Sequence, residues 1–463
     1  EAVTSHQRVL ELRPGNKSDT CNLATALIDV GKSDEALMHV QKALERAPND
    51  PLVLRTMGNV LEVRKDFNHA IGCYEKAITM DPRDPSTYNN LAAVQMRVKQ
   101  LSKAKENLLR ALSLDPNYFP ALANLGHTLN ELFEHRASLE YFDRALTICP
   151  DASAEYSNLL FGLNYNPDLS PEEIYSYYKK YDEYFCIPYK EKWPKISPNK
   201  NLKGKIKIGY LSPDFKKHSV TLYLLPILEN HDRNKFSIYL YSQLAVEDSM
   251  TERIKNKSDT YINTVGLSDE ELAKKIMADG VDLLIDLAGH TDGNRLPMLA
   301  RYKPAPTIVT FLGFGYTTGL SAVDYYLTDG VAVPTASEVL FSETPWRLPN
   351  VPLLYRPSSD TGTPEELPAI RNGYITFGTL TRSIRINADC VAIWSELLKR
   401  VKGSKLILNS QSFSDDTVKE KLVISGAATM FCKSASIALS LAFIILPFIM
   451  LSLNPVLFRV LFS

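Results

Sequence analysis

Two histidine-containing segments follow strand-like runs in the middle of the chain. The segment "GYLSPDFKKHSV" carries Asp214 and His218, and the segment "DLAGHTDGNR" carries His290 and Asp292. An imidazole titrates near neutral pH, so either histidine could act as a general acid or base. The alternative, which the residues alone leave open, is a loop histidine that hydrogen-bonds to the backbone.

A third segment, "GFGYTTG", also follows a strand-like run and is rich in glycine. Its glycines Gly313, Gly315 and Gly319 have the spacing G-x-G-x-x-x-G. This spacing differs from the dinucleotide fingerprint G-x-G-x-x-G, and no helix follows directly. We therefore interpret the segment as tight turns near a ligand and not as a site for NAD.

Arg382 and Arg385 lie in a short loop between a strand-like run and the helix-like run "ADCVAIWSELLKRV". A guanidinium group beside a helix N-terminus is well suited to bind phosphate. The two side chains could equally be solvated surface arginines, and the pattern alone does not decide between these possibilities.

The elements that must position these residues alternate between strand and helix. Strand-like runs occupy 205–212, 236–243, 281–289, 307–314 and 323–329, a helix with a glycine stop is predicted at 269–280, and further strands are predicted at 374–381 and 404–411. This alternation predicts a Rossmann-like parallel sheet, followed by the beginning of a second α/β unit. Ligands of such sheets bind beyond the carboxyl ends of the strands, so the polar loops are expected to converge on a cleft.

The N-terminal third of the chain repeats with a period of 34 residues. Proline recurs at Pro14, Pro48, Pro82, Pro116 and Pro150, and small residues recur at Ala24, Gly58, Ala92 and Gly126. This period is typical of tetratricopeptide repeats, in which small side chains let the two helices of each repeat approach closely. We predict about four repeats, which stack into an α-helical superhelix.

An asparagine keeps the same phase on the first helix of each repeat, which lines the concave face of such a superhelix. It occurs at Asn22, Asn90, Asn124 and Asn158, and Thr56 fills the remaining slot. An amide side chain both donates and accepts, so a row of them can bind the backbone of an extended peptide. Alternatively, these asparagines are surface polar residues or bond to the neighbouring repeat.

Five segments are predicted along the chain: repeats at 1–165, a helix and linker at 166–203, a Rossmann-like lobe at 204–355, the start of a second lobe at 356–420, and an apolar tail at 421–463. In the second segment, Ser170 with Glu173 forms a capping-box pattern. The lysine- and proline-rich stretch after it is interpreted as a linker.

Composition limits the classes of function. A net charge of −1 argues against a general electrostatic affinity for nucleic acid. The six cysteines form no CxxC pair, which disfavours a zinc site or a disulfide framework. We expect reduced thiols and a cytoplasmic or nuclear location.

The tail does not follow the pattern of the rest of the chain. Between Lys433 and Arg459 no charged residue occurs for 25 residues, which is long enough to cross a bilayer. The tail could be a mis-joined gene model, a membrane anchor at 434–458, or a buried core helix. In each case we expect the second lobe to be incomplete.

Several segments occur together in a fixed order: the repeats, "GYLSPDFKKHSV", "DLLIDLAGHTDGNRL", "KPAPTIVTFLGFGYTTGLSAVDYYLTD", "ETPWRLP" and "ITFGTLTRSIRIN". Together they resemble the O-linked N-acetylglucosamine transferase family (glycosyltransferase family 41), including its Spindly-like and bacterial branches. The resemblance covers roughly residues 1 to 418.

The resemblance implies a GT-B fold and an inverting transfer that needs neither metal nor cofactor. The donor would be UDP-N-acetylglucosamine, and the acceptors would be Ser or Thr hydroxyls of intracellular proteins held by the repeats. His218 matches the active-site histidine of the family and would position the substrates or handle the hydroxyl proton. Arg385, with Arg382 nearby, falls where animal members carry a lysine that binds the diphosphate. The expected cleft-lining residues are Asp214, His290, Asp292, Gly313 and Gly315.

The sequence thus predicts a protein O-glycosyltransferase whose activity is impaired by an incomplete nucleotide pocket. Two alternatives stay open: a non-catalytic repeat scaffold that binds polypeptide, or a Spindly-like transferase that uses GDP-fucose. The expected partners are acceptor polypeptides and a nucleotide sugar, and a membrane only if 434–458 is a genuine anchor.

Overall fold

A computed structural model describes residues 2–13, 15–196, 204–350, 353–355, 366–410, 413 and 430–432. The described residues of 1–149 and 365–438 form one compact unit, and those of 150–364 form another. Pro14 and the apolar stretch 434–458 lie outside the described residues. The predicted architecture, helical repeats followed by a parallel α/β region, is confirmed.

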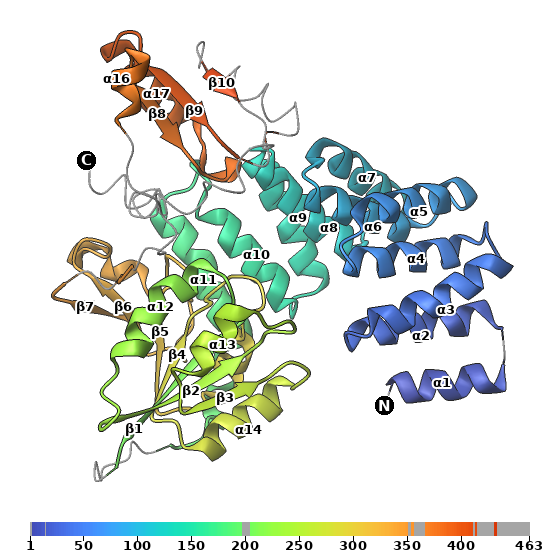
Figure 1. Ribbon diagram of the computed structural model, residues 1–463, viewed down its shortest axis with the longest axis horizontal. Coiled ribbons are helices and arrows are strands. Elements are labelled where there is room, and N and C mark those ends of the chain that lie inside the picture. Colours follow the sequence, from blue (N-terminus) through green and yellow to red (C-terminus); the bar gives the residue numbers. More distant parts are fainter. Residues whose placement is uncertain are drawn as a thin grey trace. The chain divides into compact units, whose positions relative to one another are not determined.

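The repeats are four antiparallel helix pairs, which follow helix α1 (Ala2–Leu12) (Figure 1). The pairs are α2 (Lys17–Asp29) with α3 (Ser33–Arg46), α4 (Pro51–Val63) with α5 (Phe67–Met80), α6 (Pro85–Arg97) with α7 (Leu101–Leu114), and α8 (Phe119–Glu131) with α9 (His135–Ile148). The predicted period of 34 residues is therefore the spacing of the helix pairs.

The helices begin at caps that keep the period. Asn16, Asp50 and Asp84 accept hydrogen bonds from backbone amides of the first turns of α2, α4 and α6. Each cap satisfies donors that have no partner within the helix. Pro51 and Pro85 occupy the first helical position, where a missing N–H costs nothing.

The turn between the two helices of a repeat needs a left-handed backbone at one position. That position is Gly31 in the first pair, and Lys65, Lys99 and Phe133 in the following three, with φ values of +78°, +64°, +60° and +62°. Only glycine adopts this conformation without strain, so three of the four turns carry a residue that disfavours it.

The repeat core contains matched pairs of large and small side chains. A Cβ on Gly58 would lie 2.5 Å from the Tyr74 ring, and a Cβ on Gly126 would lie 2.8 Å from the Phe142 ring. In the other two repeats the same two positions hold Ala24 with Val40 and Ala92 with Leu108, and all of these side chains are fully buried. Glycine therefore occurs opposite an aromatic ring and alanine opposite an aliphatic side chain.

The second unit contains a seven-stranded parallel sheet with the order β3-β2-β1-β4-β5-β6-β7. The strands are β1 (Ile206–Ser212), β2 (Phe236–Ser242), β3 (Thr260–Asn263), β4 (Leu283–Asp286), β5 (Thr307–Thr310), β6 (Tyr325–Asp329) and β7 (Thr344–Leu348). The connecting helices are α12 (Ser219–Asn230), α13 (Ser249–Lys255), α14 (Asp269–Asp279) and α15 (Leu296–Tyr302). The order reverses between β1 and β4, which is where such sheets bind ligands.

Five of these strands were predicted, and β3 and β7 were not. Both interleave polar residues with apolar ones, so their hydrophobic pattern is weak. β7 is the last strand in the order, and Pro345 lies within it. The N–H of Thr344 donates a hydrogen bond to the carbonyl oxygen of Asp324, which directly precedes β6. Successive residues of a strand point their backbone groups to opposite sides, so the nitrogen of Pro345 faces away from β6. Proline has no N–H to offer another strand there.

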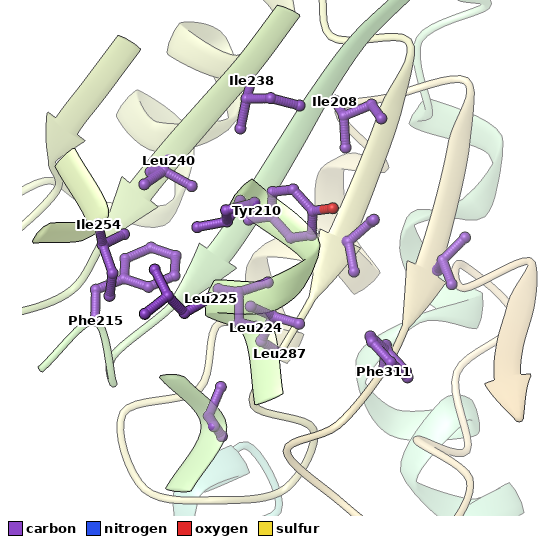
Figure 2. Close-up of a cluster of buried hydrophobic side chains, with 14 residues drawn as sticks. Ile208, Tyr210, Phe215, Leu224, Leu225, Ile238, Leu240, Ile254, Leu287 and Phe311 are labelled. Atoms are coloured by element: carbon purple, nitrogen blue, oxygen red, sulfur yellow. The ribbon is translucent and has the colours of Figure 1, made fainter. Parts of the chain in front are cut away.

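One face of the sheet packs against α12 and α13 through a continuous apolar cluster (Figure 2). The cluster includes Ile208, Tyr210, Leu240, Leu224 and Ile254, all of which are buried. It also includes Phe215, which follows β1 and is fully buried. The loop that leaves β1 is thus anchored in the core by its own aromatic residue.

Helices α10 (Ser153–Leu163) and α11 (Pro171–Phe185) belong to the same unit as the sheet. The predicted capping box between Ser170 and Glu173 is present. The predicted linker is partly ordered: Ile187–Lys192 form the 3-10 helix η1, and Trp193 Nε1 donates to Ala300 O over 2.9 Å. The linker interpretation is therefore wrong for this part, because tryptophan and tyrosine side chains pack on α15.

The predicted start of a second α/β unit is present in the residues after 365. It contains α16 (Pro368–Asn372), β8 (Thr376–Thr379), η3 (Ser383–Arg385), α17 (Ala388–Arg400), β9 (Lys405–Leu408) and β10 (Met430–Cys432). The three strands are parallel in the order β10-β9-β8. Among the described helices, none is both long and apolar enough to cross a membrane.

Candidate functional site

Three loops leave the carboxyl ends of neighbouring strands in the seven-stranded sheet. We call them the β1 loop (213–218), the β4 loop (287–295) and the β5 loop (311–321). The β1 and β4 loops flank the point where the strand order reverses. They are in contact, since a Cβ on Gly293 would lie 2.9 Å from Pro213 Cβ.

The backbone of the β1 loop is held from several sides. Thr251 Oγ1 donates to Phe215 O over 2.7 Å, and Lys217 N donates to Asp248 Oδ2 over 2.8 Å. Phe215 itself is buried in the apolar cluster of Figure 2. These contacts fix the loop and leave the side chains of Asp214 and His218 partly accessible, with 16% and 40% of their surface exposed.

His218 is the N-cap residue of α12. Its Nδ1 accepts a long hydrogen bond from Val220 N at 3.4 Å and lies 3.6 Å from Asp214 Oδ2. If Nδ1 accepts, the neutral ring carries its proton on Nε2 and can donate a hydrogen bond to a substrate. If Nδ1 instead carries the proton towards Asp214, Nε2 is free to accept a proton, as in other carboxylate–histidine pairs. The arrangement thus allows either of the two roles predicted for His218.

The β4 loop is fixed by a buried carboxylate. Asp286, at the end of β4, accepts hydrogen bonds from Gly289 N at 2.8 Å, Ala288 N at 3.2 Å and Thr310 Oγ1 at 3.1 Å. Burial raises the pKa of this carboxyl group. Asp292, predicted to line the cleft, is exposed in the turn that follows. It is next to Gly293 and therefore close to the β1 loop.

His290 does not line a cleft. Only 2% of its surface is exposed, its Nδ1 lies 2.9 Å from Ser157 Oγ, and its Nε2 lies 2.8 Å from Thr318 O. The rings of Tyr178, Tyr181 and Phe314 surround it. Burial lowers the pKa of His290 to about 4. The prediction is wrong for this residue, because the side chain points into the packing between the sheet and helices α10 and α11.

The glycines of the β5 loop differ in role. A Cβ on Gly313 would lie 1.9 Å from Leu287 O, so only glycine allows the β4 and β5 loops to approach this closely. Gly313 N also donates to Phe311 O over 2.9 Å across Leu312, whose φ is +68°. Such i to i+2 turns with positive φ are rare and strained. Gly315, by contrast, is exposed to solvent.

The two arginines predicted to bind phosphate lie in the unit that contains the repeats. Arg382 Nη2 lies 2.9 Å from Oε1 of Glu131, which is buried on α8, and Lys99 Nζ lies 3.3 Å from Oε2 of the same residue. Burial alone would raise the pKa of Glu131, but the two cations outweigh it and lower the pKa. Arg382 therefore has a structural partner. Arg385 ends η3 and is half-buried, and its role stays a prediction.

The asparagines of the repeats form a hydrogen-bonded chain between neighbouring repeats. Asn124 Nδ2 donates to Asn89 Oδ1 over 2.9 Å, Asn89 Nδ2 donates to Asn90 Oδ1 over 3.3 Å, and Asn90 Nδ2 donates to Asn59 Oδ1 over 3.0 Å. This is the alternative in which the asparagines bond to the next repeat. Asn22 is exposed. Asn158 is also exposed, but it lies on α10, which belongs to the unit of the sheet, so its part in the asparagine row stays a prediction.

Four buried or bridging residues were not predicted: Asn59 and Asn89 of the asparagine chain, Glu131, and Glu343, whose carboxylate accepts hydrogen bonds from Thr317 and Thr318 of the β5 loop. Asn59 and Asn89 lie outside the phase of the repeating asparagine, and Asn89 is visible in the sequence only as the neighbour of Asn90. Glu131 and Glu343 are single glutamates in ordinary local sequence. Their burial depends on residues far along the chain, so no local pattern identifies them.

Family models match both the repeat region and the α/β region of the chain. Residues 186–351 match the family model described as Glycosyl transferase family 41, and residues 73–106 and 119–152 match models of the tetratricopeptide repeat. The predicted family resemblance is thereby confirmed. The family 41 segment contains the β1, β4 and β5 loops, all strands of the seven-stranded sheet and Glu343.

Curated relatives match the chain over its central part. It is 31% identical over 282 residues to a Petunia hybrida protein named "Probable UDP-N-acetylglucosamine--peptide N-acetylglucosaminyltransferase SPINDLY", which covers 60% of this chain and 30% of that protein. It is 33% identical over 142 residues to a Caenorhabditis elegans "UDP-N-acetylglucosamine--peptide N-acetylglucosaminyltransferase", with 30% of this chain and 12% of that protein covered. The chain thus matches less than a third of the length of either relative.

A solved structure shows the same fold. It is that of a mutant of the Thermobaculum terrenum O-GlcNAc transferase, with a TM-score of 0.66 and 23% sequence identity. The match covers 90% of this chain and 74% of that chain. The order of helical repeats and α/β units found here is therefore an arrangement that an O-GlcNAc transferase adopts.

Proposed function

We propose that this chain takes part in the transfer of N-acetylglucosamine from UDP-N-acetylglucosamine to Ser or Thr hydroxyls of proteins. The β1 loop carries this proposal: Phe215 anchors it in the core, while Asp214 and His218 stay accessible at the reversal of the strand order. The names of the SPINDLY and nematode relatives support the same donor and a peptide acceptor.

In the proposed reaction the acceptor oxygen attacks the anomeric carbon, and the bond from that carbon to the diphosphate oxygen breaks. The hydroxyl proton must be accepted as the new bond forms, and UDP leaves. His218, with Asp214 at 3.6 Å, is the residue we propose to position the hydroxyl or accept its proton. The inverting course and the absence of a metal requirement are part of this proposal.

We propose that Arg385 neutralises charge on the departing diphosphate, since a cation at that point stabilises the transition state. Arg382 would contribute only after release from Glu131, so we expect its role to be secondary.

We propose that the repeats hold the acceptor polypeptide. The amide nitrogens of Asn90 and Asn124 are already engaged with neighbouring repeats. A peptide would therefore bind through the remaining acceptor capacity of these amides and through the exposed Asn22.

The test is a transfer assay with the purified full chain, UDP-N-acetylglucosamine and a Ser/Thr peptide. We expect transfer, and a loss of about 100-fold or more in His218→Ala, as for removal of a general base. His69→Ala, which alters an exposed histidine on α5, should leave the rate unchanged. Transfer only from GDP-fucose would replace the donor. Peptide binding without transfer from either donor would overturn the enzymatic proposal and leave a scaffold.

A further inference from the structure

Glu343 is a buried carboxylate directly before β7, with 3% of its surface exposed. Its Oε2 accepts from Thr317 Oγ1 at 2.5 Å, and its Oε1 accepts from Thr318 N at 2.7 Å and from Thr318 Oγ1. All three donors are neutral groups of the β5 loop. Burying a carboxylate among neutral donors is costly, so this arrangement calls for an explanation beyond packing.

The hydrogen bonds require two accepting oxygens at this position. Thr317 Oγ1 already accepts from Gly319 N at 3.0 Å and from Ser342 N at 3.1 Å, so its own proton must go to Glu343. An amide in place of the carboxylate would direct its NH₂ group at either the Thr317 hydroxyl or the Thr318 N–H. Either orientation leaves a buried donor without an acceptor.

The same turn is held from its other side by His290. Its Nε2 lies 2.8 Å from Thr318 O, and its Nδ1 lies 2.9 Å from Ser157 Oγ on α10. A Cβ on Gly319 would lie 2.6 Å from Tyr178 O on α11. The turn at Thr317 and Thr318 therefore has little freedom to move as long as Glu343 accepts both of its donors.

Close backbone contacts connect this turn to the β1 loop. The β5 loop touches the β4 loop twice, since a Cβ on Gly313 would lie 1.9 Å from Leu287 O and a Cβ on Gly289 would lie 2.3 Å from Phe314 Cβ. The β4 loop in turn touches Pro213, which directly precedes Asp214. Each contact leaves no room for a side chain, so a shift at one loop displaces the next.

We propose that Glu343 is a positioning residue of the family 41 site. It fixes the β5 loop and, through the β4 loop, the placement of Asp214 and His218, which it does not touch. The effect of Glu343 on catalysis rests on the proposed function. Its effect on the rigidity of the three loops is independent of that function.

The test compares Glu343→Gln with Asp259→Asn in the full chain. Asp259 also accepts a backbone N–H and a side-chain donor, from Ile238 and Arg233, but it directly precedes β3, the first strand in the sheet order, whereas Glu343 precedes β7, the last. In Glu343→Gln we expect kcat to fall about 10-fold or more, because misplaced catalytic groups lose rate steeply, with the donor KM nearly unchanged. Amide hydrogen exchange should accelerate in the β5, β4 and β1 loops.

Asp259→Asn should show neither change, and Glu343→Asp, which keeps two accepting oxygens, should recover part of the rate and of the protection. Unchanged kcat in an active enzyme, or faster exchange confined to residues 317–319, would overturn the proposal. If the wild-type chain transfers no sugar, the proposed function fails by itself. Hydrogen exchange in the three loops then still decides whether Glu343 positions them.

Discussion

The repeats and the α/β unit differ in the distance along the chain over which their important contacts form. In the repeats, Gly126 packs on Phe142 within one helix pair, and Asn90 bonds to Asn59, 31 residues away. In the α/β unit, His290 contacts Ser157 across 133 residues, and Ser321 N donates to Asp182 across 139. In a fold built from a repeated local unit, the contacts recur with the period of the sequence and can be predicted from it. In a fold built around a sheet, the contacts join residues far apart in the chain, and no sequence period indicates them.

Among substitutions that test this difference between the two regions, we expect the largest loss of stability at Gly313. In Gly313→Ala the new Cβ would overlap Leu287 O, a backbone atom that cannot rotate away. We expect a loss of about 4 kcal/mol or more in the free energy of unfolding of the α/β unit. Urea unfolding followed by fluorescence of Trp193 and Trp346 measures it. Gly315→Ala, at an exposed position two residues later, is the matched control, and equal losses in both variants would contradict the prediction.

The next effect concerns pH and His290. Burial lowers the pKa of His290 to about 4, from an ordinary value of 6.5. Below pH 6.5 the imidazole of His290 binds a proton in the unfolded chain but not in the folded chain. The free energy of unfolding that this residue contributes above pH 6.5 is therefore lost as the pH falls towards 4. We expect this residue to account for about 3 kcal/mol of that loss.

His290→Gln, which keeps a donor for Thr318 O, should flatten the dependence of unfolding free energy on pH between neutrality and the acid range. His39→Gln, which alters a partly exposed histidine on α3, should leave it as in the wild type. An unchanged slope in His290→Gln would mean that the proton uptake occurs elsewhere.

A smaller effect is expected in the repeats, where the large and small partners can be exchanged. Gly126→Ala should clash with Phe142 and cost about 2 kcal/mol. The double variant Gly126→Ala with Phe142→Leu recreates the pair found at Ala92 and Leu108 and should recover most of the loss. Unfolding followed by helical circular dichroism measures both. If the double variant is no more stable than the single one, the small residue is not required for matching the size of the side chain opposite it.

The smallest effect is expected at the turn inside each repeat. Lys65 is exposed and has a φ of +64°, whereas the equivalent Gly31 has +78°. Lys65→Gly should stabilise the repeats by about 0.5–1 kcal/mol by relieving strain, and Gly31→Ala should destabilise them by a similar amount. Melting temperatures of the two variants provide the test. A shift in the same direction for both would show that the backbone conformation is not the cause.

The sequence predicted most of the repeat unit because its physical causes are local. Cap, small residue and closing proline recur at fixed spacing, and each acts within a few turns of helix. The strands β1, β2, β4, β5 and β6 were also predicted, since each lies in a segment where apolar residues predominate or alternate with polar ones. This pattern is weak in β3 and β7, which were not predicted.

The candidate site was predicted less completely. Residue type and position after a strand identified the loop of Asp214 and His218. The same reasoning failed for His290, because nothing near it in sequence shows that α10 and α11 cover the β4 loop. It also missed Glu343, whose partners lie 25 and 26 residues away, in the β5 loop. Position relative to a strand indicates that a residue is near a sheet edge, but not whether it faces solvent or the interior.

The matched pairs in the repeats also bear on how such a chain can change length. Gly58 with Tyr74, and Gly126 with Phe142, lie within one helix pair, so both members of a pair are inherited together. Duplication or loss of one 34-residue unit therefore leaves every internal fit intact. What such an event breaks is the set of links between units, such as Arg55 with Asp84 and Asn124 with Asn89. Duplication or deletion of a unit can thus lengthen or shorten the superhelix without disturbing the packing inside each unit. The contacts between units determine which copies can be neighbours.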